Sequence, residues 1–128
     1  MSYRSICIRN ENAFTLIEVL VGLVILVIGL LVLAVMQISA IKGSYFSSNV
    51  TQATFLTQER LEYLKNLPYN DSDLSSGQYN EGTISGTIFS RQYNIAEDTG
   101  NPMKTITVTV QWADRGNHSV SISTIRSK

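Results

Sequence analysis

Residues 14–36 read FTLIEVLVGLVILVIGLLVLAVM, and this stretch decides the fold. Its only charged residue is Glu18, and residues 19–36 contain no charge, side-chain amide or hydroxyl. At about 1.5 Å of rise per residue, a helix over this stretch is about 35 Å long, enough to cross a hydrocarbon core of about 30 Å. A domain this small has too few residues to cover a helix that is apolar on every face. The sequence therefore predicts a transmembrane helix over residues 14–36.

The residues on either side of this helix indicate its orientation. Arg4 and Arg9 precede it with one acid, Glu11, whereas the first cation after it is Lys42. The positive-inside rule then places the N-terminus in the cytoplasm and the rest of the chain outside. No good small-residue cleavage site follows the apolar region near Met36, which argues against an ordinary secretory signal. We expect a single-pass membrane protein.

Residues 13–20, AFTLIEVL, resemble the N-terminal signal shared by type IV prepilins and type II secretion pseudopilins. The resemblance implies that residues 1–13 form a leader, which a prepilin peptidase removes by cutting between Ala13 and Phe14. It also implies N-methylation of Phe14, and it makes Glu18 the fifth residue of the mature chain, where the family has a glutamate. The chain departs from the family in having Ala13 where Gly is usual. Because Ala is the closest substitute in size, we expect slower cleavage rather than none.

The resemblance implies a role for Glu18 in assembly. A carboxylate in a membrane segment costs up to about 2.5–3.5 kcal/mol, so it is rarely kept without a partner. In a filament of this family, the new amino terminus at Phe14 of one subunit approaches the glutamate of a neighbour. Pairing offsets the desolvation of both charges and fixes the register of the subunits. The alternative is that Glu18 lies near the helix end and reaches the membrane interface.

Residues 37–67 continue the helix with an amphipathic pattern. Their apolar positions recur mostly at three- or four-residue spacing, with two steps of five: Ile38, Ile41, Tyr45, Val50, Ala53, Leu56, Leu61, Leu64 and Leu67. Pro68 predicts the end of the helix, because proline disfavours helical geometry at the residue before it. We therefore expect one long helix whose second half packs on a small head.

Residues 68–82 are rich in turn-forming residues, which predicts a loop with little regular structure. Asp71, Asp73, Ser75 and Glu81 raise the question of a calcium site, because this ion prefers oxygen ligands. Counted from Asp71, the loop has no Gly at the sixth position and no Glu at the twelfth, as an EF-hand loop would require. We therefore expect a solvated acidic loop, with no metal and no cofactor.

Residues 83–128 carry the period of strands. Apolar residues alternate with Thr over 105–112 and with Ser over 119–125, and the turn at 113–117 joins these two runs. An earlier run over 83–95 provides a further strand. These patterns predict an antiparallel meander of three or four strands, with its apolar face on the helix and its Thr/Ser face in water. The fold class is α+β and resembles that of pilins.

Catalysis and nucleic-acid binding find little support in the composition. The chain has one His, His118, and one Cys, Cys7, and its ten basic and ten acidic residues balance. His118 follows a turn and is expected to be an exposed surface residue. A single Cys excludes an internal disulfide, and Cys7 lies in the predicted leader. The sequence shows no phosphate loop, zinc spacing or basic stripe, so we expect neither an enzyme nor a nucleic-acid partner.

The sequence is therefore identified as that of a pilin-like filament subunit, and its small head and residues 16–37 resemble those of PilV-type minor pilins. Its expected partners are the prepilin peptidase, the membrane, and other pilins or minor pilins contacted through the N-terminal helix. We expect it first in the bacterial inner membrane, with a periplasmic head, and then in a type IV pilus at the cell surface. Two alternatives stay open: a minor pseudopilin of a type II secretion system, and a membrane-anchored binding domain that never polymerises.

Overall fold

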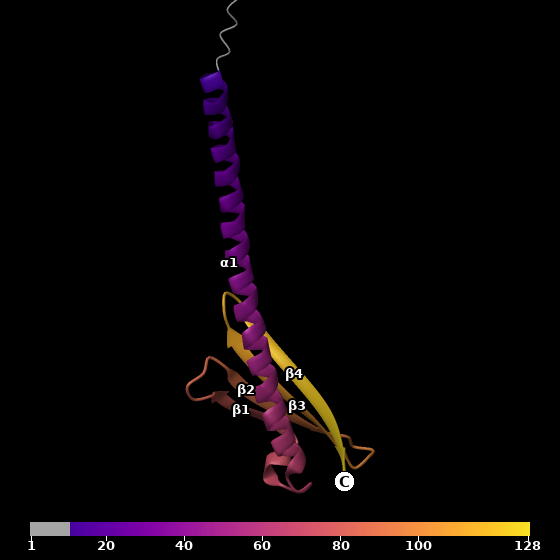
Figure 1. The fold of residues 1–128 in the computed structure, drawn as a ribbon. Helices are drawn as coiled ribbons and strands as arrows, with labels where there is room; N and C mark the ends of the chain where they lie inside the picture. The colour runs from indigo at the N-terminus through magenta and orange to yellow at the C-terminus, as the bar shows by residue number, and fades with distance from the viewer. Residues whose placement is uncertain (1–10) are drawn as a thin grey trace, which may run out of the picture. The chain divides into compact units, whose positions relative to one another are not determined.

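The structure, a computed structural model, describes the backbone of residues 11–128 and the side chains of residues 15–128. Most of the predicted leader, with Arg4, Cys7 and Arg9, lies outside the described residues. The elements in order are α1 (Glu11–Asn66), the 3₁₀ turn η1 (Ser72–Leu74), β1 (Gly77–Thr83), β2 (Ser90–Glu97), β3 (Met103–Ala113) and β4 (Asn117–Ser127). Figure 1 shows these elements. The chain divides after Ser44 into two units, which we describe separately.

The first unit contains the apolar part of α1. All of residues 15–44 are exposed. Among the described residues, one helix, Thr15–Asn66, is long and apolar enough to cross a membrane, and none of its most apolar window is buried. Exposed apolar side chains over such a length are typical of a helix that lies in lipid or packs on other helices. The long helix predicted to end just before Pro68 is present and ends at Asn66.

The second unit begins with the remainder of α1 and contains all four strands. The sheet has the order β1-β2-β3-β4, and every neighbouring pair is antiparallel. This is the predicted meander, with four strands. The β3–β4 hairpin is in register from Met103 opposite Ser127 to Ala113 opposite Asn117. Its turn holds Arg115 at a positive φ of 52°.

The core lies between the sheet and the second half of α1, as the alternation predicted. Ile106, Val108, Val110 and Trp112 of β3 are each at most 4% exposed. They belong to two clusters, one containing Leu61 and Leu64 of α1 and the other containing Ala53 of α1. On the opposite, hydroxyl face, Thr107 bonds Ser123 at 2.9 Å and Thr109 bonds Ser121 at 2.7 Å. The predicted α+β class is confirmed.

The carbonyl oxygens at the C-terminal end of α1 accept hydrogen bonds from a side chain of β4. The guanidinium of Arg126, on β4, donates through Nη1 to the carbonyl oxygens of Leu64 and Leu67. The last carbonyls of a helix lack partners within the helix, so a cation there satisfies them and also complements the helix dipole. Arg126 therefore ties the end of the helix to β4.

The prediction of a loop with little regular structure over residues 68–82 is wrong. η1 and β1 both lie within this range. Leu74 is fully buried, and the ring of Tyr79 on β1 stacks on that of Tyr93 on β2, with 4.7 Å between centroids. These contacts join residues that are distant in the sequence. The local composition, which is rich in turn-forming residues, therefore does not predict them.

The acidic residues of this segment serve the fold. The carboxylate of Asp71 accepts from the backbone N–H of Asp73 and caps η1. Glu81 forms ion pairs with Arg60 of α1 and Arg91 of β2. Over residues 15–128, no three His, Cys, Asp or Glu side chains gather in a way that could hold a metal ion. Asp71 and Glu81 therefore already have structural partners.

Tyr93 gives the second unit a predicted pH dependence. Burial, followed by the charge of Asp73, raises the pKa of its hydroxyl above 10.0. The folded protein then holds this proton more tightly than the unfolded chain, so the stabilisation is complete below about pH 10 and is lost as the pH rises further. We expect the urea midpoint of the detergent-solubilised chain to fall as the pH rises above about 10, and to fall less in Tyr93→Phe. An equal fall in both proteins would contradict this assignment.

Candidate functional site

The candidate site lies in the first two turns of α1, around Glu18. The Glu18 side chain is exposed, and it is the only charge between Glu11 and Lys42. Its neighbours Ile17 and Val19 are apolar and are 62% and 64% exposed. An ionised carboxylate in such surroundings loses its water when the helix enters lipid or a helix bundle, at a cost of up to about 2.5–3.5 kcal/mol. The site therefore favours a cationic partner.

Ala13 and Phe14 lie within α1, which begins at Glu11. Their side chains lie outside the described ones, so only their backbone positions can be given. The first N–H groups of a helix have no partner within it, so opening this first turn around the predicted cut costs little. Phe14 and Glu18 are four residues apart, which puts them on the same side of the helix, about 6 Å apart along its axis.

Residues 8–34 match the family described as the prokaryotic N-terminal methylation motif. The matched residues include Ala13, Phe14 and Glu18. The match supports a type IV pilin-like or pseudopilin subunit, and it implies processing by a prepilin peptidase and association with a membrane. The same comparisons found no match among the curated proteins or the solved structures.

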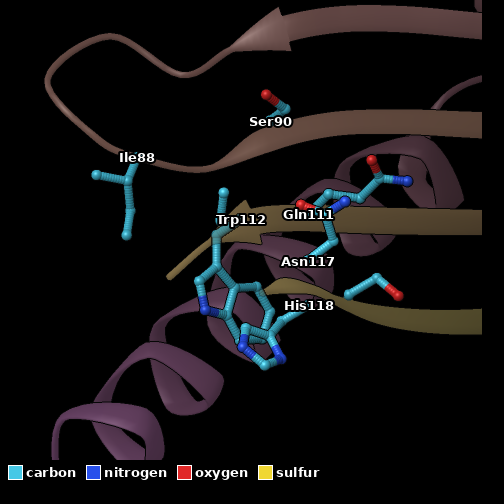
Figure 2. A pocket seen from close by; sticks show the side chains of 8 residues that line it. Ile88, Ser90, Gln111, Trp112, Asn117 and His118 are labelled. Carbon is cyan, nitrogen blue, oxygen red and sulfur yellow. The ribbon is translucent and has the colours of Figure 1, made fainter. Parts of the chain in front are cut away.

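A pocket of about 510 Å³ lies in the second unit, near the turn between β3 and β4 (Figure 2). Its lining consists of apolar side chains and neutral polar ones: Ile88, Ser90, Gln111, Trp112, Ala113, Asn117, His118 and Ser119. The lining includes no carboxylate, lysine, arginine or cysteine.

His118 differs from its prediction as an exposed surface residue. It is half-buried, because its ring lies 5.4 Å from that of Trp112 and 5.1 Å from that of Phe46 on α1, centroid to centroid. One ring nitrogen, Nε2, lies 3.1 Å from the carbonyl oxygen of Asp114. The sequence carries a signal for this position, because His118 shares the two-residue period of Val120, which faces α1.

Proposed function

We propose that this chain is a minor pilin. It is inserted in the inner membrane with its N-terminus in the cytoplasm, and a prepilin peptidase cuts it between Ala13 and Phe14. Phe14 is then N-methylated, and the helix joins a type IV pilus or primes its assembly. The observation that carries this proposal is the match over residues 8–34, together with Glu18 at the fifth position after the expected cut.

The chemistry of the site supports assembly as the role of Glu18. Once the chain is cut, Phe14 carries an amine that stays protonatable after methylation. In a bundle of apolar helices, this amine of one subunit and the Glu18 carboxylate of another each offset the desolvation of the other. The function is therefore mechanical: the same carboxylate that is costly in lipid sets the register of subunits in the fibre.

The sequence outside the motif favours a minor subunit. A major pilin of this family commonly closes a C-terminal loop with a disulfide, whereas this chain has Cys7 alone. Its sheet is small, with four strands. The LIEVLVGLVILVIGLLVLAVMQ sequence of residues 16–37 also resembles that of PilV-type minor pilins. A minor pseudopilin shares these features, so the test must report where the chain is found.

The test is the mass and N-terminal sequence of the full chain, produced together with the prepilin peptidase of its host. We expect a mature chain that begins at N-methylated Phe14, and faster cleavage of the Ala13→Gly variant, which restores the usual family residue. Recovery of the mature chain in pili sheared from the cell surface supports the minor pilin. Cleavage without any recovery in sheared pili would favour a pseudopilus. An uncut chain would leave only a membrane-anchored domain.

A further inference from the structure

β4 is an edge strand with one side unpaired. It pairs with β3 along Asn117–Ser127, and no strand lies on its other side within the described residues. We call that side the free edge. Over residues 119–125 the strand contains no charged residue and no proline. A long, uncharged edge of this kind is a template for another strand, and proteins usually protect against it.

The direction of the backbone groups on β4 follows from two hydrogen bonds. The N–H of Lys128 donates to the carbonyl oxygen of Pro102 at 3.1 Å, and this pair continues the β3–β4 register by one position. The carbonyl of the next residue on β3, Met103, accepts from the N–H of Asp98 and therefore points toward β2. Since bonding alternates along an antiparallel pair, even-numbered residues of β4 bond β3. The odd-numbered residues, Ser119, Ser121, Ser123 and Ile125, therefore direct their N–H and C=O groups to the free edge.

The opposite edge of the sheet, β1, is protected where β4 is not. β1 has seven residues against the eleven of β4, and its register shifts between Asn80 and Gly82. It also carries Glu81, which is held in ion pairs by Arg60 and Arg91. A bulge, a charge and a short length are the devices that prevent strand addition. The β1 edge is therefore protected against the addition of another strand, whereas the free edge of β4 is not.

The side chains of β4 indicate which kind of strand would fit. Ser121 and Ser123 already bond Thr109 and Thr107 of β3 on the hydroxyl face. On the face toward α1, Val120 and Ile122 are only half-buried, because β3 lies on one side of them and no described strand lies on the other. A strand with the alternation of β3, hydroxyl residues on one face and β-branched apolar residues on the other, would extend the hydroxyl row and cover the apolar one.

A second copy of this chain does not fit the free edge in a membrane. Ala53 shares a cluster with Val110, and Leu64, later in α1, shares the other cluster with Ile106, earlier in β3. This part of α1 therefore runs along the sheet against β3 and in the direction of β4. Antiparallel pairing of β4 with its own copy requires a two-fold axis perpendicular to the sheet, which reverses this helix segment in the copy. The two ends at residue 45, each leading to a membrane segment, would then point in opposite directions.

A neighbour in the same orientation presents a suitable strand from its other edge. In an antiparallel meander of four strands, the first strand runs antiparallel to the fourth. A subunit of similar topology, standing upright beside this one, therefore offers its first strand antiparallel to β4. In this chain that strand is the bulged β1, so the partner is a different subunit.

We propose that the free edge of β4 binds the first strand of a different filament subunit, running antiparallel to β4, uncharged, and alternating hydroxyl with apolar residues. The proposal rests on the proposed function, because it takes the partner from the same filament. It makes Ser119, Ser121, Ser123 and Ile125 the residues whose backbone groups hold that subunit.

The test uses photo-crosslinking from the full chain in cells that assemble the fibre. Benzoyl-phenylalanine replaces Ser119 or Ser123, whose exposed side chains lie on the hydroxyl face. We expect both positions to crosslink one segment of one other subunit, with the two attachment points in reverse order, about four residues apart. Ser121→Pro, which removes an outward N–H while leaving the bonds to β3, should lower both yields at least about tenfold.

Thr83→Pro is the matched control. Ile84 donates to the carbonyl of Phe89 at 2.9 Å, so the N–H of Thr83 faces outward on the β1 edge and its loss should leave the crosslinks unchanged. Absent crosslinks, crosslinks that Ser121→Pro does not reduce, or crosslinks to β4 of a second copy would overturn the proposal. Ser121→Lys, which keeps the ladder and adds a charge, checks that the loss does not come from misfolding. If the wild-type chain is recovered in sheared pili without these crosslinks, only the proposed binding role of the β4 edge is rejected. An uncut chain would reject the proposed function.

Discussion

Replacing Glu18 with Ala should leave cleavage intact and reduce recovery of the chain in fibres by about a hundredfold. Removing one partner of a buried ion pair costs about 3–5 kcal/mol, because the other charge is left without compensation. An energy of about 3 kcal/mol corresponds to about a hundredfold in an equilibrium constant. Glu18 has only apolar residues beside it from Leu16 to Leu20, so no acid next to it can replace its charge. The measurement is quantitative immunoblotting of sheared fibres against the mature chain left in the membrane.

Two variants separate the charge of Glu18 from its size and position. Glu18→Gln keeps the shape but not the charge, and it should be excluded from fibres nearly as strongly as Glu18→Ala. Ile17→Ala removes an exposed apolar side chain at the adjacent position, and it should be incorporated nearly as well as wild type. Normal incorporation of Glu18→Gln would mean that the carboxylate only reaches the membrane interface and has no role in register.

The helix and the β3–β4 hairpin could be predicted from the sequence because their signals are local and periodic. Pro68 marks the end of α1 to within two residues. The strict alternation over residues 105–112 places Ile106, Val108 and Val110 in the core, where they are fully buried. In each case a short window of residues contains the whole pattern that predicts the element.

β1 and the surroundings of His118 could not be predicted in the same way. The polar segment containing β1 becomes a strand because Tyr79 meets Tyr93 and Glu81 meets Arg60, contacts that join distant parts of the chain. His118 is covered by Phe46, which is 72 positions earlier in the sequence. Propensity read from neighbouring residues does not report such contacts.

For the candidate site, the sequence motif is more informative than the fold. Ala13, Phe14 and Glu18 are proposed to act on a peptidase and on neighbouring subunits, so other chains set their working geometry. The helix places Phe14 and Glu18 on one side. The roles proposed for all three residues rest on the motif over residues 8–34. The free edge of β4 could be recognised only from the fold, because the order of strands in the sheet decides which strand lies at an edge.

Replacing Lys104 with Ala should destabilise the second unit by about 3 kcal/mol. Lys104 is 7% exposed, and its Nζ donates to the carbonyl oxygens of Tyr69 at 3.2 Å and Leu74 at 2.9 Å. It also pairs with Glu97 at 2.9 Å. Without the ammonium, the buried Leu74 carbonyl keeps no charged donor, and hydrogen bonds to charged groups contribute about 1.5–3 kcal/mol each. Urea unfolding of the detergent-solubilised chain, followed by the fluorescence of its single Trp, measures the loss.

Lys104→Met and Glu97→Gln divide this loss among its causes. Met keeps most of the apolar stem that packs beside the segment 68–76, so it should cost less than Ala, and the difference measures packing. Glu97 is 46% exposed, so its pair with Lys104 should contribute less than about 1 kcal/mol. A loss in Glu97→Gln as large as that in Lys104→Ala would assign the effect to the ion pair. The two carbonyl bonds are the expected cause, because they fasten the segment between α1 and β1 to the sheet and so hold Leu74 in the core.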